Sequence, residues 1–280
     1  MTSRSEQTTS YIIPSRPEVL IKITEEIKAE DPNTNGICTA IKNDVALFSS
    51  IISSVNSAYY GFDQPISSIE HAVSLLGLKR TFNIVRLAAL KNSLSDVGPM
   101  ERFWDTATEV ARICAALSTQ FTNIDSDKAY TLGMLHDIGI PLLMRAKSDY
   151  KEFLRTMNGL SLTAIHDAEV ECYGVSHYQL SAELARKWNM SETTAEAIGR
   201  QPFYRETFKE PADENEEMRL SLCLLLLARD ISDAYRHFWR LPEPKDPLIE
   251  LRTALDFLGI SDFDYADLKE DIVSTLSLQQ

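Results

Sequence analysis

Apolar residues recur at helical spacing along nearly the whole chain. The clearest stretch runs from Met100 to Phe121, where apolar residues lie three or four positions apart and therefore share one face of a helix. These residues are Phe103, Ala107, Val110, Cys114, Leu117 and Phe121. No stretch alternates apolar and polar residues as a half-buried strand does. The pattern predicts an all-α protein.

Polar residues that favour helix starts precede several of these stretches. The sequence SSIE predicts a capping box, in which the Ser67 hydroxyl and the Glu70 carboxylate each bind a free backbone amide at the helix start. Gly77 suits the end of that short helix. Further helix starts are predicted at Ser126, at Ser176, and at Asp213 with Glu216.

A charged, proline-containing segment divides the chain. Residues 200–217, RQPFYRETFKEPADENEE, separate a long N-terminal helical body from a C-terminal group of about three helices. In that group, the apolar run at 222–227 can pack either into the main body or against a second copy of the chain. The sequence leaves both arrangements open.

The charge of the chain bears on its partners. There are 28 Lys and Arg residues against 41 Asp and Glu residues, which gives a net charge of -13 that repels nucleic acids and anionic membranes. The only basic cluster is GLKR at 77–80. The N-terminus lacks the apolar core of a secretory signal, and the longest apolar run is too short to span a bilayer. We therefore expect a cytoplasmic protein that binds neither nucleic acid nor membrane.

Five segments together have the character of a known domain. They are IPSRPEVLIKI at 13–23, IKNDVALFSSIISSVNSAYYGFDQPISSIEHAVSLLGLKRTFNIV at 41–85, FWDTATEVA at 103–111, AYTLGMLHDIGIPLL at 129–143 and YGVSHYQLSAELARKW at 173–188. Taken together, they resemble the HDOD domain, the HD-related output domain of bacterial signalling proteins. The resemblance implies an all-helical fold in which an N-terminal helical subdomain precedes an HD-phosphohydrolase-like bundle. It predicts a tail at 1–12, an HDOD domain at 13–204, and a helical extension at 205–280 that packs on the domain.

The neighbouring residues His136 and Asp137, in LGMLHDIGIPLL, form the first candidate metal site, because imidazole and carboxylate are ligands for zinc, iron and manganese. In the phosphohydrolases that the bundle resembles, an upstream His and a distant Asp complete the ligand set. Here Asp105 and Thr106 stand where that His is expected, and AIGRQPFY at 197–204 lacks the His pair of many relatives. We therefore expect His136 and Asp137 to be structural, with no catalytic residue, metal or cofactor.

Two further groups contain histidines that could bind a cation. His177, at a predicted helix start near the HD pair, is either a replacement ligand or a packing and capping residue. His166 and Glu169 lie within one helical turn and could share a cation, although a solvated helix face is the expected arrangement.

The segment NSAYYG, with the helix that follows it, is a candidate surface for a ligand or a partner. Asn56, Tyr59 and Tyr60 lie just before Gly61, where a helix is expected to end, and Glu70 follows at the start of the next helix. These residues either lock the joint between the subdomains or form a partner-facing surface or a small-ligand pocket.

We expect a non-enzymatic regulator of bacterial signal transduction that acts through protein contacts. HDOD proteins are often fused to receiver or cyclic-dinucleotide enzyme domains, so the resemblance implies partners of those kinds. One alternative is a diverged metal-dependent phosphohydrolase in which His177 or Glu169 replaces a lost ligand. Another is a sensor that binds a nucleotide or other small molecule in the former HD pocket without turnover.

Overall fold

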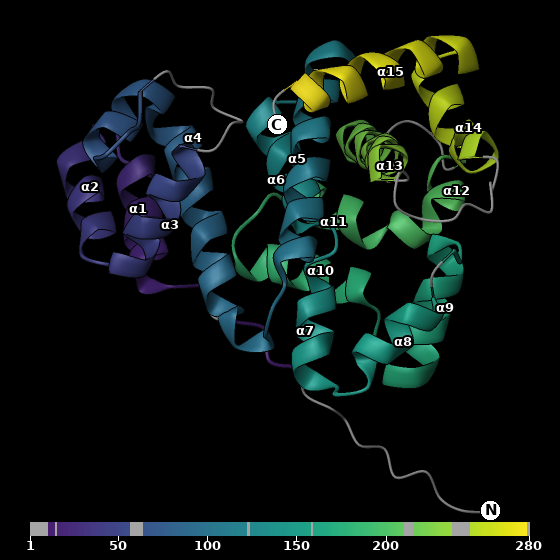
Figure 1. Cartoon of the computed structure of the whole chain (residues 1–280), viewed down its shortest axis with the longest axis horizontal. Coiled ribbons are helices and arrows are strands. Elements are labelled where there is room, and N and C mark those ends of the chain that lie inside the picture. The colour runs from purple at the N-terminus through teal and green to yellow at the C-terminus, as the bar shows by residue number, and fades with distance from the viewer. Residues whose placement is uncertain are drawn as a thin grey trace, which may run out of the picture.

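The computed structural model describes residues 11–14, 16–56, 64–121, 124–157, 159–209, 215–236 and 247–278. Every regular element in these ranges is a helix, so the prediction of an all-α fold is confirmed (Figure 1). Among the described residues, no helix has the length and apolar character needed to cross a membrane.

The first helices form a body of their own, at the left of Figure 1. They are α1 (Glu18–Lys28), α2 (Thr34–Lys42), α3 (Val45–Val55) and the first part of α4 (Ile69–Ser93). Helix α4 bends at Gly77, where φ is +78° and ψ is 162°, a backbone conformation that favours glycine. The predicted short helix therefore ends at Gly77, and a second helical stretch follows at once and reaches the main bundle.

The predicted capping box at Ser67 is wrong by one residue. The Ser68 hydroxyl accepts the hydrogen bond from the His71 amide, and Glu70 forms an ion pair with Lys42 of α2. The sequence offers two consecutive serines, and the second of them caps the helix. The start at Ser176 is confirmed, with a full capping box that includes Gln179.

The other two predicted starts have different outcomes. Ser126 is the first residue of its helix, and the preceding Asp125 is the N-cap, whose carboxylate accepts from the amides of residues 127 and 128. Asp213 lies outside the described residues, and the helix there begins at Glu216.

The main bundle follows α4 and a 3-10 turn, η1 (Ser95–Val97). Its helices are α5 (Glu101–Phe121), α6 (Ser126–Leu135), α7 (Gly139–Ala146), α8 (Tyr150–Thr156), α9 (Leu162–Tyr173), α10 (His177–Lys187), α11 (Glu192–Gly199) and α12 (Tyr204–Thr207), with the 3-10 turn η2 (Gln201–Phe203) before α12. The C-terminal helices are α13 (Glu216–Arg236), α14 (Pro247–Leu258) and α15 (Asp262–Leu278).

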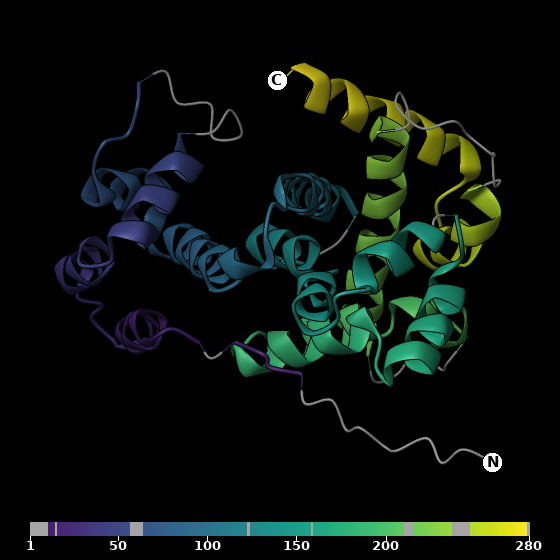
Figure 2. The same cartoon turned by 60° about the horizontal axis from the view of Figure 1, so that its bottom comes forward.

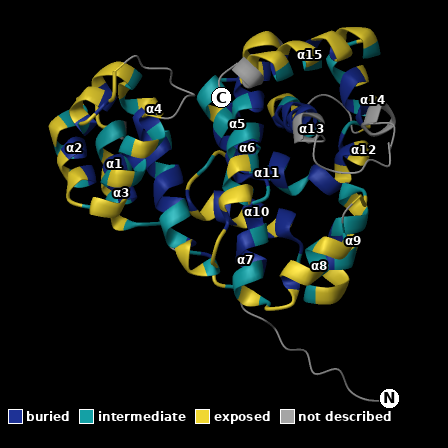
Figure 3. Cartoon of the chain, viewed as in Figure 1, coloured by how far each residue is buried: buried dark blue, intermediate teal, exposed yellow. Residues whose placement is uncertain are grey.

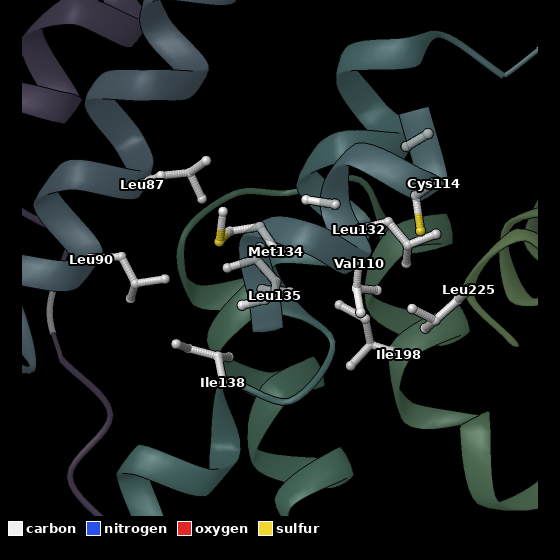
Figure 4. Packing of buried hydrophobic residues seen from close by; sticks show 14 of the residues in the cluster. Leu87, Leu90, Val110, Cys114, Leu132, Met134, Leu135, Ile138, Ile198 and Leu225 are labelled. Carbon is white, nitrogen blue, oxygen red and sulfur yellow. The ribbon is translucent and has the colours of Figure 1, made fainter. Parts of the chain in front are cut away.

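Helix α13 lies inside the bundle, against α5, α6 and α11. Residues 222–228 are buried, so the apolar run packs into the main body of its own chain (Figure 3). Leu225 of α13 belongs to the same core cluster as Val110 of α5 and Ile198 of α11 (Figure 4). The core therefore continues across the predicted boundary at residue 204, and the boundary itself stays a prediction.

A short extended segment, residues 11–14, ties the N-terminal side of the chain to the bundle before α1 begins. Lys187 Nζ donates to the carbonyl oxygen of Ile13 at 2.7 Å, and Trp188 Nε1 donates to that of Pro14 at 3.1 Å. Figure 2 shows this segment passing beside α10 on its way to α1. The N-terminal body is thus joined to the bundle through this segment as well as through α4.

Candidate functional site

Two glycines bring the HD pair into contact with the neighbouring helices. A Cβ on Gly133 of α6 would lie 2.6 Å from the Cα of Ala111, and a Cβ on Gly139 of α7 would lie 2.0 Å from the carbonyl oxygen of His177. Glycine therefore lets α6 approach α5 and lets α7 approach the start of α10 more closely than any other residue allows. His136 and Asp137 occupy the turn between α6 and α7, beside His177.

The His136 side chain is buried and turned back toward its own helix. Its Nδ1–H donates to the carbonyl oxygen of Gly133 at 2.6 Å, since a carbonyl can only accept. Its Nε2 lies 3.2 Å from Oδ2 of Asp137. The flanking Leu135 and Ile138 belong to the hydrophobic core (Figure 4).

The Asp137 carboxylate is held by an arginine from α13. Arg229 Nη1 lies 2.8 Å from Asp137 Oδ1 and also donates to Oε1 of Gln201 at 2.9 Å. Gln201 Nε2 in turn donates to the carbonyl oxygen of His136 at 3.1 Å. Burial alone would raise the pKa of Asp137, but the guanidinium and the two neighbouring imidazoles outweigh it and hold that pKa well below its usual range.

His177 stands between two carboxylates. Its Nδ1 lies 2.7 Å from both oxygens of Glu169, and its Nε2 lies 3.5 Å from Oδ1 of Asp137. The His177 backbone amide also donates to Glu169 at 2.8 Å, and the Tyr150 hydroxyl donates to the same carboxylate. Burial alone would lower the pKa of His177, but the hydrogen bonds to Asp137 and Glu169 raise that pKa above the usual histidine value.

Asp137, Glu169, Arg229 and His177 therefore form one connected cluster. The side chains of Glu169 and His177 are almost fully buried, whereas those of Asp137 and Arg229 are 18% and 23% exposed. A buried ion pair needs both partners, because removing either partner leaves a charge without solvation. The arrangement is consistent with the expectation that His136 and Asp137 are structural residues.

The predicted solvated face of α9 is wrong. Glu169 is fully buried, and His166 is buried with its Nδ1 2.9 Å from the Ser176 hydroxyl. Both side chains point toward the start of α10, because Leu162, His166, Glu169 and Tyr173 are spaced four, three and four residues apart and so share the inner face of α9. His166 and Glu169 hold the two helices together.

The predicted partner surface is only partly described. Tyr59 and Tyr60 lie outside the described residues. Asn56 is bonded to Ile66 twice: its Nδ2 donates to the carbonyl oxygen of Ile66 at 2.7 Å, and its Oδ1 accepts from the Ile66 amide at 2.7 Å. Glu70 is paired with Lys42. Both contacts lie within the N-terminal body, so neither locks the joint between the subdomains, and a binding role for this surface stays a prediction.

The residues present do not fit the metal that the HD resemblance implies. Across the described ranges, no group of three or more His, Cys, Asp or Glu side chains is arranged to hold a metal ion. Thr106, at the position expected for the upstream ligand, donates its hydroxyl to the carbonyl oxygen of Arg102 within its own helix, at 2.8 Å. His136 Nε2 and His177 Nε2 each approach one oxygen of the Asp137 carboxylate, at 3.2 and 3.5 Å.

Three residues of this site were not predicted from the sequence. They are Arg229, which belongs to the cluster, and Gln201 and Tyr150, which form hydrogen bonds with its members. Arg229 directly follows the buried apolar run of α13, and a charged residue on such a buried helix is a signal for an internal partner. Gln201 and Tyr150 carry no such signal.

A protein-family model matches the part of the chain that contains the HD pair. The model of the HDOD domain matches residues 13–202, which is more than half of the chain. The chain belongs to the HDOD family. Arg229 and the whole of α13 lie beyond the matched segment, so a helix outside the HDOD match completes the buried cluster of the HD pair.

Individual proteins are similar to this chain in sequence or in structure. A protein of Treponema pallidum (strain Nichols), with no assigned function, is 25% identical over 189 residues, which are 66% of this chain and 37% of the relative. The chain thus spans well under half of that relative. A crystal structure of an HDOD domain protein from Geobacter sulfurreducens aligns with a TM-score of 0.68 and 21% identity, over 96% of this chain and 91% of the other.

Two other crystal structures share the HDOD fold with similar scores. One from Shewanella amazonensis SB2B is provisionally named a phosphohydrolase, with a TM-score of 0.69, 20% identity, and 93% and 90% of the two chains covered. One from Marinobacter aquaeolei VT8 is provisionally named a signal transduction protein, with a TM-score of 0.67, 20% identity, and 94% and 57% covered. At these identities the likeness shows the fold alone.

Proposed function

We propose that this HDOD protein is a non-enzymatic regulator of bacterial signal transduction that acts through protein contacts. HDOD membership supports a signalling role, as does the provisional name of the Marinobacter neighbour. The provisional name of the Shewanella neighbour is the reason to test hydrolysis directly.

One observation carries the proposal. The atoms of His136, Asp137 and His177 that would have to face a metal instead face one another, Glu169 and Arg229. A hydrolytic metal site needs at least three protein ligands around a position open to water or substrate. The buried cluster uses the same side chains to join α6, α7, α9, α10 and α13.

A phosphohydrolase assay tests the non-enzymatic half of the proposal. The purified chain is incubated with phosphomonoesters, phosphodiesters and cyclic dinucleotides, each with added Mn²⁺, Fe²⁺ or Zn²⁺. We expect the release of phosphate or nucleotide to equal that of His136→Ala and of a buffer blank. Metal-dependent turnover by the wild-type chain that is absent from His136→Ala would overturn the proposal.

A binding titration tests the partner half. Purified receiver domains and cyclic-dinucleotide enzymes from the source genome are titrated against the full chain by calorimetry, with an unrelated acidic helical protein as the control. We expect saturable binding to a member of these classes and none to the control. Absence of saturable binding across the complete genomic set would contradict partners of these two kinds.

A further inference from the structure

We propose that Arg229 is a tethered cation that takes the charge-balancing place of the metal in the HD pocket. The inference rests on the proposed function, in which this pocket has no resident metal. It adds a specific cause for the lack of a resident metal, namely a cation supplied by a helix that lies beyond the HDOD match. It also gives α13 a role, which is to keep the HD pair in its metal-free arrangement.

The contact between the guanidinium and the carboxylate is the first support. Arg229 Nη1 lies 2.8 Å from Oδ1 of Asp137, the oxygen that also faces Nε2 of His177. A metal bound to that oxygen would lie at about 2 Å. It would therefore stand within a few Å of a permanently charged guanidinium, and two cations that close together repel strongly in a buried site.

The charge of the cluster is the second support. Arg229 already places one positive charge 2.8 Å from the Asp137 carboxylate, so a divalent metal on the same carboxylate would add two more beside it. Such a concentration of positive charge is costly where little solvent is present. Removal of Arg229 leaves the Asp137 carboxylate without this cation.

The anchoring of Arg229 is the third support. It follows a run of α13 in which every side chain from Leu222 to Ala228 is at most 5% exposed, so the backbone that carries it is fixed in the core. Its Nη1 also donates to Gln201, whose own amide is bound to the carbonyl oxygen of His136. The Nη1 group of Arg229 is thus held at the HD pair by two acceptors, Asp137 and Gln201.

Substitution of Arg229 tests this inference. The melting temperature of Arg229→Met and of the wild-type chain is measured in chelator and in Mn²⁺ or Zn²⁺, and metal affinity is measured by calorimetry. We expect Arg229→Met to melt lower than wild type in chelator, to recover part of that loss with the divalent ion, and to bind the ion at least ten times more tightly than wild type. Arg252→Met, which removes an exposed ion pair with Asp262, is the matched control and should show none of these effects.

Two further variants make the result specific. Adding His136→Ala to Arg229→Met should abolish the gain in metal affinity, because the metal would lose an imidazole ligand. Arg229→Gln removes the charge while keeping a hydrogen-bonding side chain, and it replaces Arg229→Met in the same measurements if the latter fails to fold.

The outcomes separate this inference from the proposed function. Stoichiometric metal in the wild-type chain would overturn both. A metal-free wild type, together with an Arg229 variant that melts like wild type or gains no metal affinity, would overturn the role of Arg229 alone.

Discussion

Gly139 packs directly against the backbone of His177, so that a Cβ at position 139 would lie 2.0 Å from the His177 carbonyl oxygen. The glycine of the HDIG sequence is therefore where α7 meets α10. This contact places the HD pair beside His177, and it leaves no room for a side chain. Packing therefore requires glycine at position 139, regardless of the function of the pocket.

We expect Gly139→Ala to lower the free energy of unfolding by about 3 kcal/mol, because the added methyl group must push two backbones apart. Urea unfolding followed by circular dichroism measures the change. Gly199→Ala is the control, since a Cβ there would lie 3.3 Å from the Ala182 Cβ and alanine is the better helix former. Equal stability of the two variants would show that α7 and α10 can move apart at little cost in free energy.

The raised pKa of His177 predicts a pH dependence. A histidine whose pKa is raised by folding contributes stability fully below its unfolded pKa of about 6.5 and loses it as the pH rises through the folded pKa. The stability difference between wild type and His177→Gln should therefore shrink between pH 6 and pH 9. The loss is about 1.4 kcal/mol for each unit by which folding raises the pKa.

Chemical unfolding at a series of pH values measures this difference. His71→Gln, which removes an exposed histidine of α4, is the control variant. A difference between wild type and His177→Gln that stays constant or grows with pH would mean that protonated His177 does not balance the two carboxylates.

The two hydrogen bonds between Asn56 and Ile66 give a prediction about the stability of the N-terminal body. Both ends of the Asn56 amide are bonded to the backbone of Ile66, which is buried. Asn56→Ala should lower the free energy of unfolding by about 2 kcal/mol, because the partners of the amide lose their hydrogen bonds. Asn35→Ala, at an exposed position in α2, is the control for thermal and urea unfolding. Wild-type stability of Asn56→Ala would show that the bonds to Ile66 do not stabilise the N-terminal body.

The helices of the fold could be predicted because their signals are local. The stripe from Phe103 to Leu117 and the capping box at Ser176 depend on residues within a few turns of one another. The error at SSIE has the same local origin, since either Ser67 or Ser68 can cap a helix. The ion pair of Glu70 with Lys42, 28 residues away, is what the local pattern could not show.

The candidate site was harder to predict because its contacts are long-range. His136 and Asp137 stand out in the sequence, but Asp137 is paired with Arg229, 92 residues further along the chain. No periodicity links those positions. The burial of Glu169 was missed for a related reason, since a carboxylate on a helix face is usually solvated unless a distant group compensates it.

Elemental analysis of the wild-type chain, purified without chelator, tests the central claim most directly, with His136→Ala analysed in parallel. The account predicts well under one equivalent of iron, manganese or zinc per chain, with the same small amount in the variant. About one equivalent in the wild type that disappears in His136→Ala would contradict it, because His136 and Asp137 would then belong to a working metal site.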